Sequence, residues 1–72
     1  MTPPDMQYVD SSNVEAIGFD SEAGEIHVQF QGGRTYVYGE TDEVTFEELR
    51  DADSIGSYVN RVLKPNHPCR EL

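Results

Sequence analysis

The chain has 72 residues, with 14 Asp or Glu against 5 Lys or Arg, so its formal net charge is −9. Its length allows one small domain, its single cysteine excludes an intrachain disulfide, and no apolar run approaches the roughly 20 residues of a membrane span. The N-terminus has no basic segment followed by an apolar one, so it does not resemble a signal peptide. We therefore expect a cytoplasmic protein with no membrane partner, whose surface as a whole repels nucleic-acid phosphates.

The first twenty-five residues predict an arm, a strand and a turn. Residues 1–10 contain two prolines and show no apolar periodicity, which predicts a flexible N-terminal arm. Residues 12–20 carry apolar side chains in imperfect alternation, which predicts a first strand, and Gly18 within it predicts a bulge or a close approach of another backbone. Residues 21–25, SEAGE, have the composition of a turn.

Two further strands follow. Residues 25–31, EIHVQFQ, alternate strictly between apolar and polar side chains, which is typical of a half-buried strand. The glycine pair at 32–33 predicts a tight hairpin, and residues 34–40 predict the third strand. Three consecutive strands joined by short turns form an antiparallel meander.

Tyr36 and Tyr38 lie two residues apart on the third strand, so they point to the same face. On an exposed face they would form a stacking platform for nucleic-acid bases. On a covered face they would belong to the hydrophobic core. We favour the core, because the chain has only seven aromatic residues, and in that arrangement Thr35 and Val37 face solvent together with His27.

The second half of the chain predicts two helices. Residues 41–52 predict the first, with Thr45 as its N-cap in a capping box. A second helix begins with Ser54 as its N-cap and carries apolar residues at helical spacing. Pro65 ends it, and residues 66–72 form a C-terminal tail.

The order of elements is β-β-β-α-α. The apolar face of the strands has to be covered, and the two helices are the available cover. The sequence therefore predicts an α+β domain over residues 11–65, built from a three-stranded antiparallel meander with two C-terminal helices packed on one face.

Three motifs follow one another in this domain: Phe30-x-x-Gly33, Tyr36-x-Tyr38 and the run from Ala52 to Asn60. In this order they resemble the KTSC domain, which is found at the C-terminus of some lysyl-tRNA synthetases and as free-standing bacterial, archaeal or phage proteins. The resemblance implies a small α+β fold and, by association with the synthetase, RNA binding. The motif residues, which we expect to be structural, are Phe30, Gly33, Tyr36, Tyr38, Ser54, Gly56, Tyr58 and Asn60.

Gly56 and Asn60 admit two interpretations. Gly56 near the start of the second helix could leave backbone N–H groups open to an anion. Alternatively, Gly56 lets a strand pass close to the helix, and Asn60 bonds a loop backbone. We favour the second interpretation.

The charges are distributed unevenly, which separates two candidate binding functions. We favour a protein-interaction module that uses an acidic face, whose candidate residues are Glu40, Asp42, Glu43, Glu47 and Asp51. The alternative is an RNA-binding module, whose candidate residues are Arg34, Arg61, Lys64 and Arg70. The acidity also admits a third explanation, general solubility or salt adaptation.

Enzymatic and metal-dependent functions are not predicted. His27, His67 and Cys69 are too sparse to form a typical ligand set, so we expect no metal and no cofactor. A two-layer domain of this length offers little room for an enclosed catalytic pocket. We expect a non-enzymatic binding module that is a monomer or a weak homodimer.

Overall fold

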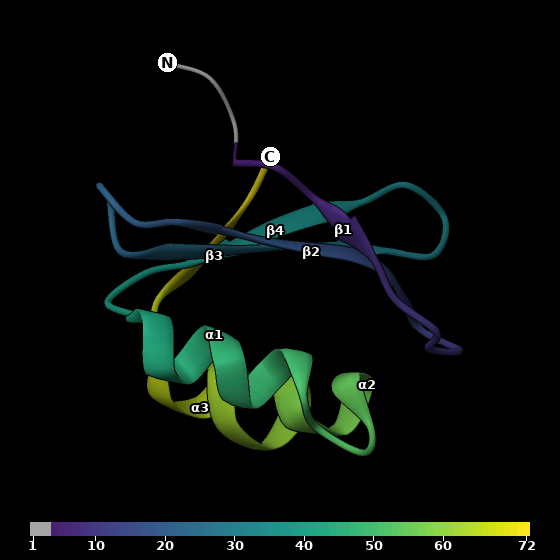
Figure 1. Ribbon diagram of the computed structural model, residues 1–72. Coiled ribbons are helices and arrows are strands. Elements are labelled where there is room, and N and C mark those ends of the chain that lie inside the picture. Colours follow the sequence, from purple (N-terminus) through teal and green to yellow (C-terminus); the bar gives the residue numbers. More distant parts are fainter. Residues whose placement is uncertain (1–3) are drawn as a thin grey trace.

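An antiparallel sheet forms one layer of the molecule and helices form the other, in a computed structural model that describes residues 4–72 (Figure 1). Residues 1–3 of the expected arm lie outside the described residues. The predicted α+β architecture, with C-terminal helices on one face of the sheet, is confirmed. The strands follow chain order across the sheet: β1 (Gln7–Tyr8), β2 (Val14–Asp20), β3 (Glu25–Phe30), β4 (Thr35–Tyr38) and β5 (Cys69–Glu71).

The prediction of a three-stranded meander is wrong, because the sheet has five strands. β1 lies in the expected arm and pairs with β2, and β5 lies in the expected tail and pairs with β4. They have two and three residues, too few to show an alternating pattern. Each one pairs with an edge of the central meander, where unpaired backbone groups would otherwise remain.

The first helix is α1 (Glu43–Arg50), and its N-cap is Asp42, not Thr45 as predicted. An Asp42 carboxylate oxygen accepts hydrogen bonds from the Thr45 backbone N–H and hydroxyl, each at 2.8 Å. These bonds lower the pKa of Asp42. The helix begins earlier than predicted because an aspartate is one of the most effective N-caps.

The second helical segment runs through α2 (Ile55–Tyr58), the π-helical turn η1 (Val59–Leu63) and α3 (Lys64–Asn66). Ser54 is its N-cap, as predicted, and accepts a hydrogen bond from the Ser57 backbone N–H. The segment continues one residue past Pro65, the predicted end. In a regular α-helix a proline ring clashes with the carbonyl four residues earlier, and the wider π-helical turn before Pro65 accommodates the ring.

The core lies between the two layers. It includes Tyr38, which is 4% exposed and packs as predicted, while Tyr36 is half-buried against its margin. The other core residues are Val14, Ile17, Ile26, Val28, Leu49, Ile55, Val59 and Leu63.

The outer face of the sheet is covered, which contradicts the prediction that Val37 and His27 face solvent. Val37 is 0% exposed and His27 is 8% exposed. They are register partners, and His27 also pairs with Gly18. A Cβ at Gly18 would lie 2.8 Å from the Asp5 carbonyl oxygen, so the N-terminal segment crosses this face, and the predicted close approach at Gly18 is confirmed.

Among residues 4–72, no helix combines the length and apolarity that crossing a membrane requires.

Candidate functional site

An open hollow lies between α1 and the sheet. Its lining includes two stacked rings, Phe19 from β2 and Phe46 from α1, whose centroids are 5.6 Å apart with planes at 17°. The hollow has a volume of about 480 Å³. We call it the acidic hollow, and its lining residues are Asp5, Gln7, Phe19, Ser21, Glu43, Phe46, Glu47 and Arg50.

Three carboxylates and one guanidinium border the acidic hollow. Glu43 and Glu47 lie one helical turn apart on α1, and Asp5 joins them from the N-terminal segment. Arg50 is engaged by Asp51, with Nε and an Asp51 oxygen 3.2 Å apart. Sequence reasoning missed Asp5 because no local pattern brings the N-terminal segment to a hollow that α1 also borders.

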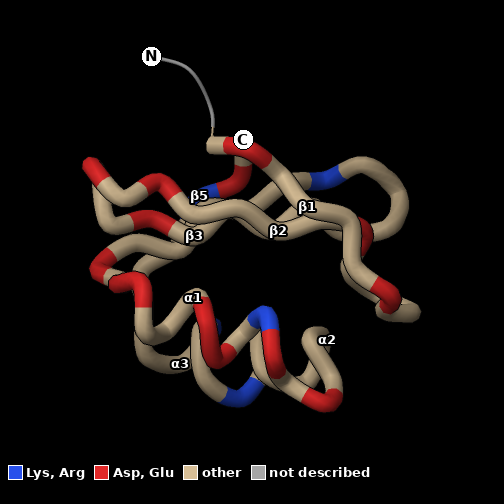
Figure 2. Tube along the Cα trace, in the orientation of Figure 1, with Lys and Arg blue, Asp and Glu red and all other residues tan. Residues whose placement is uncertain are grey.

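The five predicted acidic residues do not all border this hollow. Figure 2 shows acidic positions along α1 and the loops at its ends. Of the other three, Asp42 caps α1 and Asp51 pairs with Arg50. Glu40 occupies the preceding loop with a φ of 55°, and its carbonyl contacts the His67 ring at 3.1 Å.

The four predicted basic residues do not form one patch. Arg70 pairs with Val37 in register, so it lies on the outer face, where its guanidinium donates to both Glu25 carboxylate oxygens at 2.7 and 3.2 Å. Arg61 is exposed on η1. Arg34 and Lys64 border the same groove.

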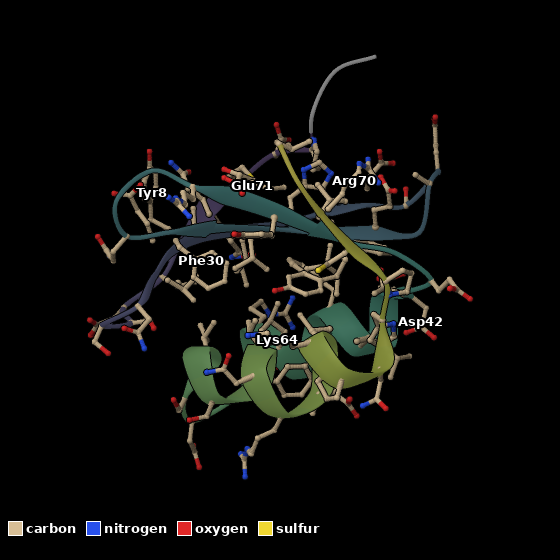
Figure 3. The ribbon with its side chains drawn as sticks, turned by 180° about the vertical axis from the view of Figure 1, so that it is seen from behind. Tyr8, Phe30, Asp42, Lys64, Arg70 and Glu71 are labelled. Atoms are coloured by element: carbon tan, nitrogen blue, oxygen red, sulfur yellow. The ribbon has the colours of Figure 1, made fainter. Side chains whose placement is uncertain are left out.

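That groove lies between the sheet and the last helical segment. Figure 3 shows Phe30 on the sheet above Lys64 on the helix, with Arg70 beyond the sheet. Phe30 and Tyr36 make an edge-to-face contact, with centroids 5.6 Å apart. We call this the aromatic groove. Its volume is about 310 Å³, and its lining residues are Phe30, Gln31, Arg34, Tyr36, Tyr38, Asn60, Lys64 and Cys69.

Motif residues of the sequence therefore meet in the aromatic groove, although they come from different elements. Phe30, Tyr36, Tyr38 and Asn60 all contribute to its lining. Asn60 is exposed, and its predicted bond to a loop backbone is not among the hydrogen bonds of residues 4–72.

The remaining motif residues have structural contacts. Ser54 caps α2, and the Tyr58 hydroxyl donates to Glu48 at 2.9 Å, while burial raises the pKa of Tyr58 to about 12. Gly33 has a φ of 96°, a left-handed conformation that the hairpin requires and that glycine adopts readily. A Cβ at Gly56 would lie 3.4 Å from the Asn13 side chain, so the segment that passes close to α2 is the loop before β2 and not the predicted strand.

One cluster of potential metal ligands was not predicted. Potential ligand atoms of Asp20, Glu25 and His27 all lie within 4.8 Å of one another. Burial lowers the pKa of His27, which favours the neutral imidazole. Both oxygens of Glu25 accept hydrogen bonds from Arg70, so a cation here would compete with that guanidinium.

Comparison with known proteins identifies a family. The sequence profile of the KTSC domain matches residues 10–67. A protein of Tsukamurella paurometabola is 42% identical over 60 residues, which cover 83% of this chain and 90% of that protein. A protein of Stutzerimonas stutzeri is 35% identical over 57 residues, which cover 79% and 80%.

The fold also matches a solved structure. The crystal structure of a KTSC domain protein from Yersinia pestis superposes with a TM-score of 0.88 at 30% sequence identity. The match covers 97% of this chain and 99% of that one. The described fold is therefore shared across nearly the full length of both proteins.

Proposed function

The chain belongs to the KTSC domain family, and from that premise we propose that it is a small, non-enzymatic binding module whose acidic hollow docks a basic segment of a partner protein. We place this function in the cytoplasm, because a small domain with a single cysteine suits a reducing compartment.

The observation that carries the proposal is the combination of aromatic rings and carboxylates in one hollow. The stacked rings of Phe19 and Phe46 offer apolar surface and π-electron density to the alkyl stem and cationic head of a lysine or arginine. Glu43, Glu47 and Asp5 supply acceptors for its N–H groups. An isolated acidic surface would lack the apolar ring surface against which the stem packs.

The overall charge supports the same class of partner. With a net charge of −9, the protein attracts positively charged surfaces over several ångströms at moderate ionic strength, which raises the association rate. The attraction weakens as salt shortens the Debye length.

An NMR titration of ¹⁵N-labelled protein tests the proposal with a lysine- and arginine-rich peptide and an acidic peptide of equal length. We expect saturable shifts at Phe19, Glu43, Phe46 and Glu47 with the basic peptide alone. The Glu43→Gln/Glu47→Gln variant should bind about tenfold more weakly, since each lost charge-assisted contact contributes about 1.5–3 kcal/mol when well desolvated and less at an open surface.

A matched variant separates the hollow from net charge. Glu22→Gln/Asp53→Asn also removes two negative charges, but from exposed positions outside the lining of the acidic hollow. This variant should bind the basic peptide like the wild type. Equal losses in both variants, or shifts spread evenly over the surface, would reject docking at the acidic hollow.

RNA is the alternative partner, and the arrangement of basic residues supports it less. Arg70 and Lys64 lie on opposite sides of the sheet (Figure 3), and Arg70 is bonded to Glu25. A phosphate backbone is bound best by several cations along one track. Titration with single-stranded RNA at low salt checks this alternative, which predicts shifts that disappear steeply as salt is added.

A further inference from the structure

The aromatic groove differs in charge from the rest of this acidic protein. Its eight lining residues include two of the five Lys and Arg residues of the chain and none of the fourteen Asp and Glu residues. Arg34 and Lys64 are exposed, and neither is in a salt bridge within residues 4–72. The groove therefore offers two cationic hydrogen-bond donors that form no salt bridge within residues 4–72.

The hydroxyl of a mostly buried tyrosine, Tyr38, is available at the same groove. The Tyr38 side chain lines it although the residue is only 4% exposed. Its hydroxyl has no hydrogen-bond partner within residues 4–72. In that part of the chain, every side-chain N or O atom that is fully buried has a hydrogen-bond partner. The hydroxyl therefore has access to solvent, and in the groove that Tyr38 lines a ligand atom can accept its proton.

The remaining polar groups complete a site that favours acceptors. The Asn60 side-chain amide, on the opposite wall, can donate and accept. The Tyr36 hydroxyl already donates to Glu71, with the two oxygens 3.3 Å apart, so the ring of Tyr36 is held in place. Because Tyr38, Arg34 and Lys64 present donors, the complementary ligand carries an oxyanion.

The aromatic residues define the rest of the ligand. Phe30 and Tyr36 meet edge to face, so ring surface and ring edges both line the groove, and a planar ring can pack against them. A volume of about 310 Å³ lies at the lower end of the range for small-molecule pockets. It suits one ring with a short substituent.

We infer that the aromatic groove is a binding site for a small ligand made of a planar ring that carries one oxyanion, either a phosphate or a carboxylate. The oxyanion lies between Arg34 and Lys64 and accepts from the Tyr38 hydroxyl, while the ring packs on Phe30 and Tyr36. This site is separate from the acidic hollow: the two linings share no residue, so neither depends on the other.

NMR titration of the full chain with four probes tests the inference. Phenyl phosphate and benzoate carry both features on the same ring, phenol carries the ring alone, and inorganic phosphate carries the oxyanion alone. We expect saturable shifts at Arg34, Tyr38 and Lys64 with at least one complete probe, and binding of each partial probe at least about tenfold weaker. Whichever complete probe binds more tightly assigns the oxyanion as phosphate or carboxylate.

Two variants and a control locate the contacts. Tyr38→Phe removes only the hydroxyl, Lys64→Met removes the charge but retains the stem, and each should weaken the better complete probe about tenfold. Arg61→Met removes an equal charge outside the lining and should bind like the wild type. The dispersion of the amide spectrum shows whether each variant is folded.

Several outcomes would overturn the inference. These are the absence of saturable binding by both complete probes, equal binding of a partial and a complete probe, and an equal loss in Arg61→Met and Lys64→Met. Binding of a short single-stranded RNA without binding of either complete probe would also overturn it, because the groove would then be part of a strand-binding surface.

Discussion

At the scale of single residues, Gly18 shows how two segments distant in sequence meet. A Cβ there would lie 2.6 Å from the Met6 sulfur and 2.8 Å from the Asp5 carbonyl oxygen. A side chain can rotate away, but the Asp5 backbone oxygen moves only with its segment of the chain. The glycine therefore allows the N-terminal segment to cover the outer face of the sheet, and it brings Asp5 to the acidic hollow.

Replacing that glycine should destabilise the protein. We expect Gly18→Ala to lower the free energy of unfolding by about 1–3 kcal/mol, the typical cost of overpacking a close contact. Urea denaturation measures the change. Gly39→Ala is the control, because a Cβ at Gly39 would lie 3.5 Å from its nearest neighbour, a side-chain atom of Pro68, and it should change stability by less. Equal effects would show that the contact at Gly18 is not responsible.

The Glu25–Arg70 pair should appear in the pH dependence of stability. The hydrogen bonds from Arg70 lower the pKa of Glu25, so folding favours the ionised carboxylate. The stabilisation is fully present above the unfolded pKa of about 4.3 and is lost as the pH falls through the folded value. We therefore expect Glu25→Gln to flatten the acid limb of a plot of urea midpoint against pH.

A second carboxyl provides the comparison for that limb. Glu22 lies exposed in the turn between β2 and β3 and forms no salt bridge within residues 4–72. Glu22→Gln should leave the acid limb as steep as in the wild type. A limb that stays equally steep in Glu25→Gln would show that other groups control acid stability.

At the scale of elements, β5 adds the C-terminal segment to the sheet as its last strand. It pairs with β4 along its length, and the Leu72 N–H donates to the Thr35 carbonyl at 2.9 Å. Its residue Cys69 borders the aromatic groove, and its residue Arg70 binds Glu25. A strand of three residues thus protects one edge of the sheet and contributes to both of its faces.

Deleting residues 69–72 should expose the edge of β4. We expect the free energy of unfolding to fall by roughly 2 kcal/mol, because net backbone hydrogen bonds contribute about 0.5–1.5 kcal/mol each. The exposed edge should also promote self-association. Urea denaturation and size-exclusion chromatography measure these effects, and a chain shortened by Leu72 alone should show a much smaller change. A deletion that is stable and monomeric would contradict the role of β5.

At the scale of the whole molecule, charge opposes the compact state. Fourteen acidic and five basic residues are confined to a body with principal extents of 29 × 22 × 19 Å. Like charges therefore lie within a Debye length of one another at low salt, and their repulsion lowers the stability of the folded state. Both proposed sites use this uneven distribution, since acids border one and are missing from the lining of the other.

Salt should therefore stabilise the protein. Between low salt and about 1 M NaCl we expect the thermal midpoint to rise by about 4–8 °C, which corresponds to about 1 kcal/mol for a domain of this size. Thermal denaturation followed by circular dichroism measures the rise. Glu22→Gln/Asp53→Asn, with two charges fewer, should begin at a higher midpoint and rise less. An unchanged midpoint would show that repulsion is not a significant cost.

The sequence by itself determined what depends on neighbouring residues. Strict alternation in β3, the glycine pair before β4, and the Ser54 cap with its apolar helical face predicted the order of elements and the layer that covers the sheet. These signals are local because backbone geometry repeats every two residues in a strand and every 3.6 in a helix. The motifs also placed the chain in its family.

Only the tertiary structure decided what depends on contacts between distant segments. β1 and β5 are too short to produce a periodic pattern, and they form because the central strands provide edges to pair with. Val37 and His27 are buried because the chain crosses a face that alternation alone marks as polar. Packing makes Asp5 and residues of α1 border one hollow, and Lys64 and Phe30 border one groove. Neither the acidic hollow nor the aromatic groove is therefore visible as a spacing in the chain.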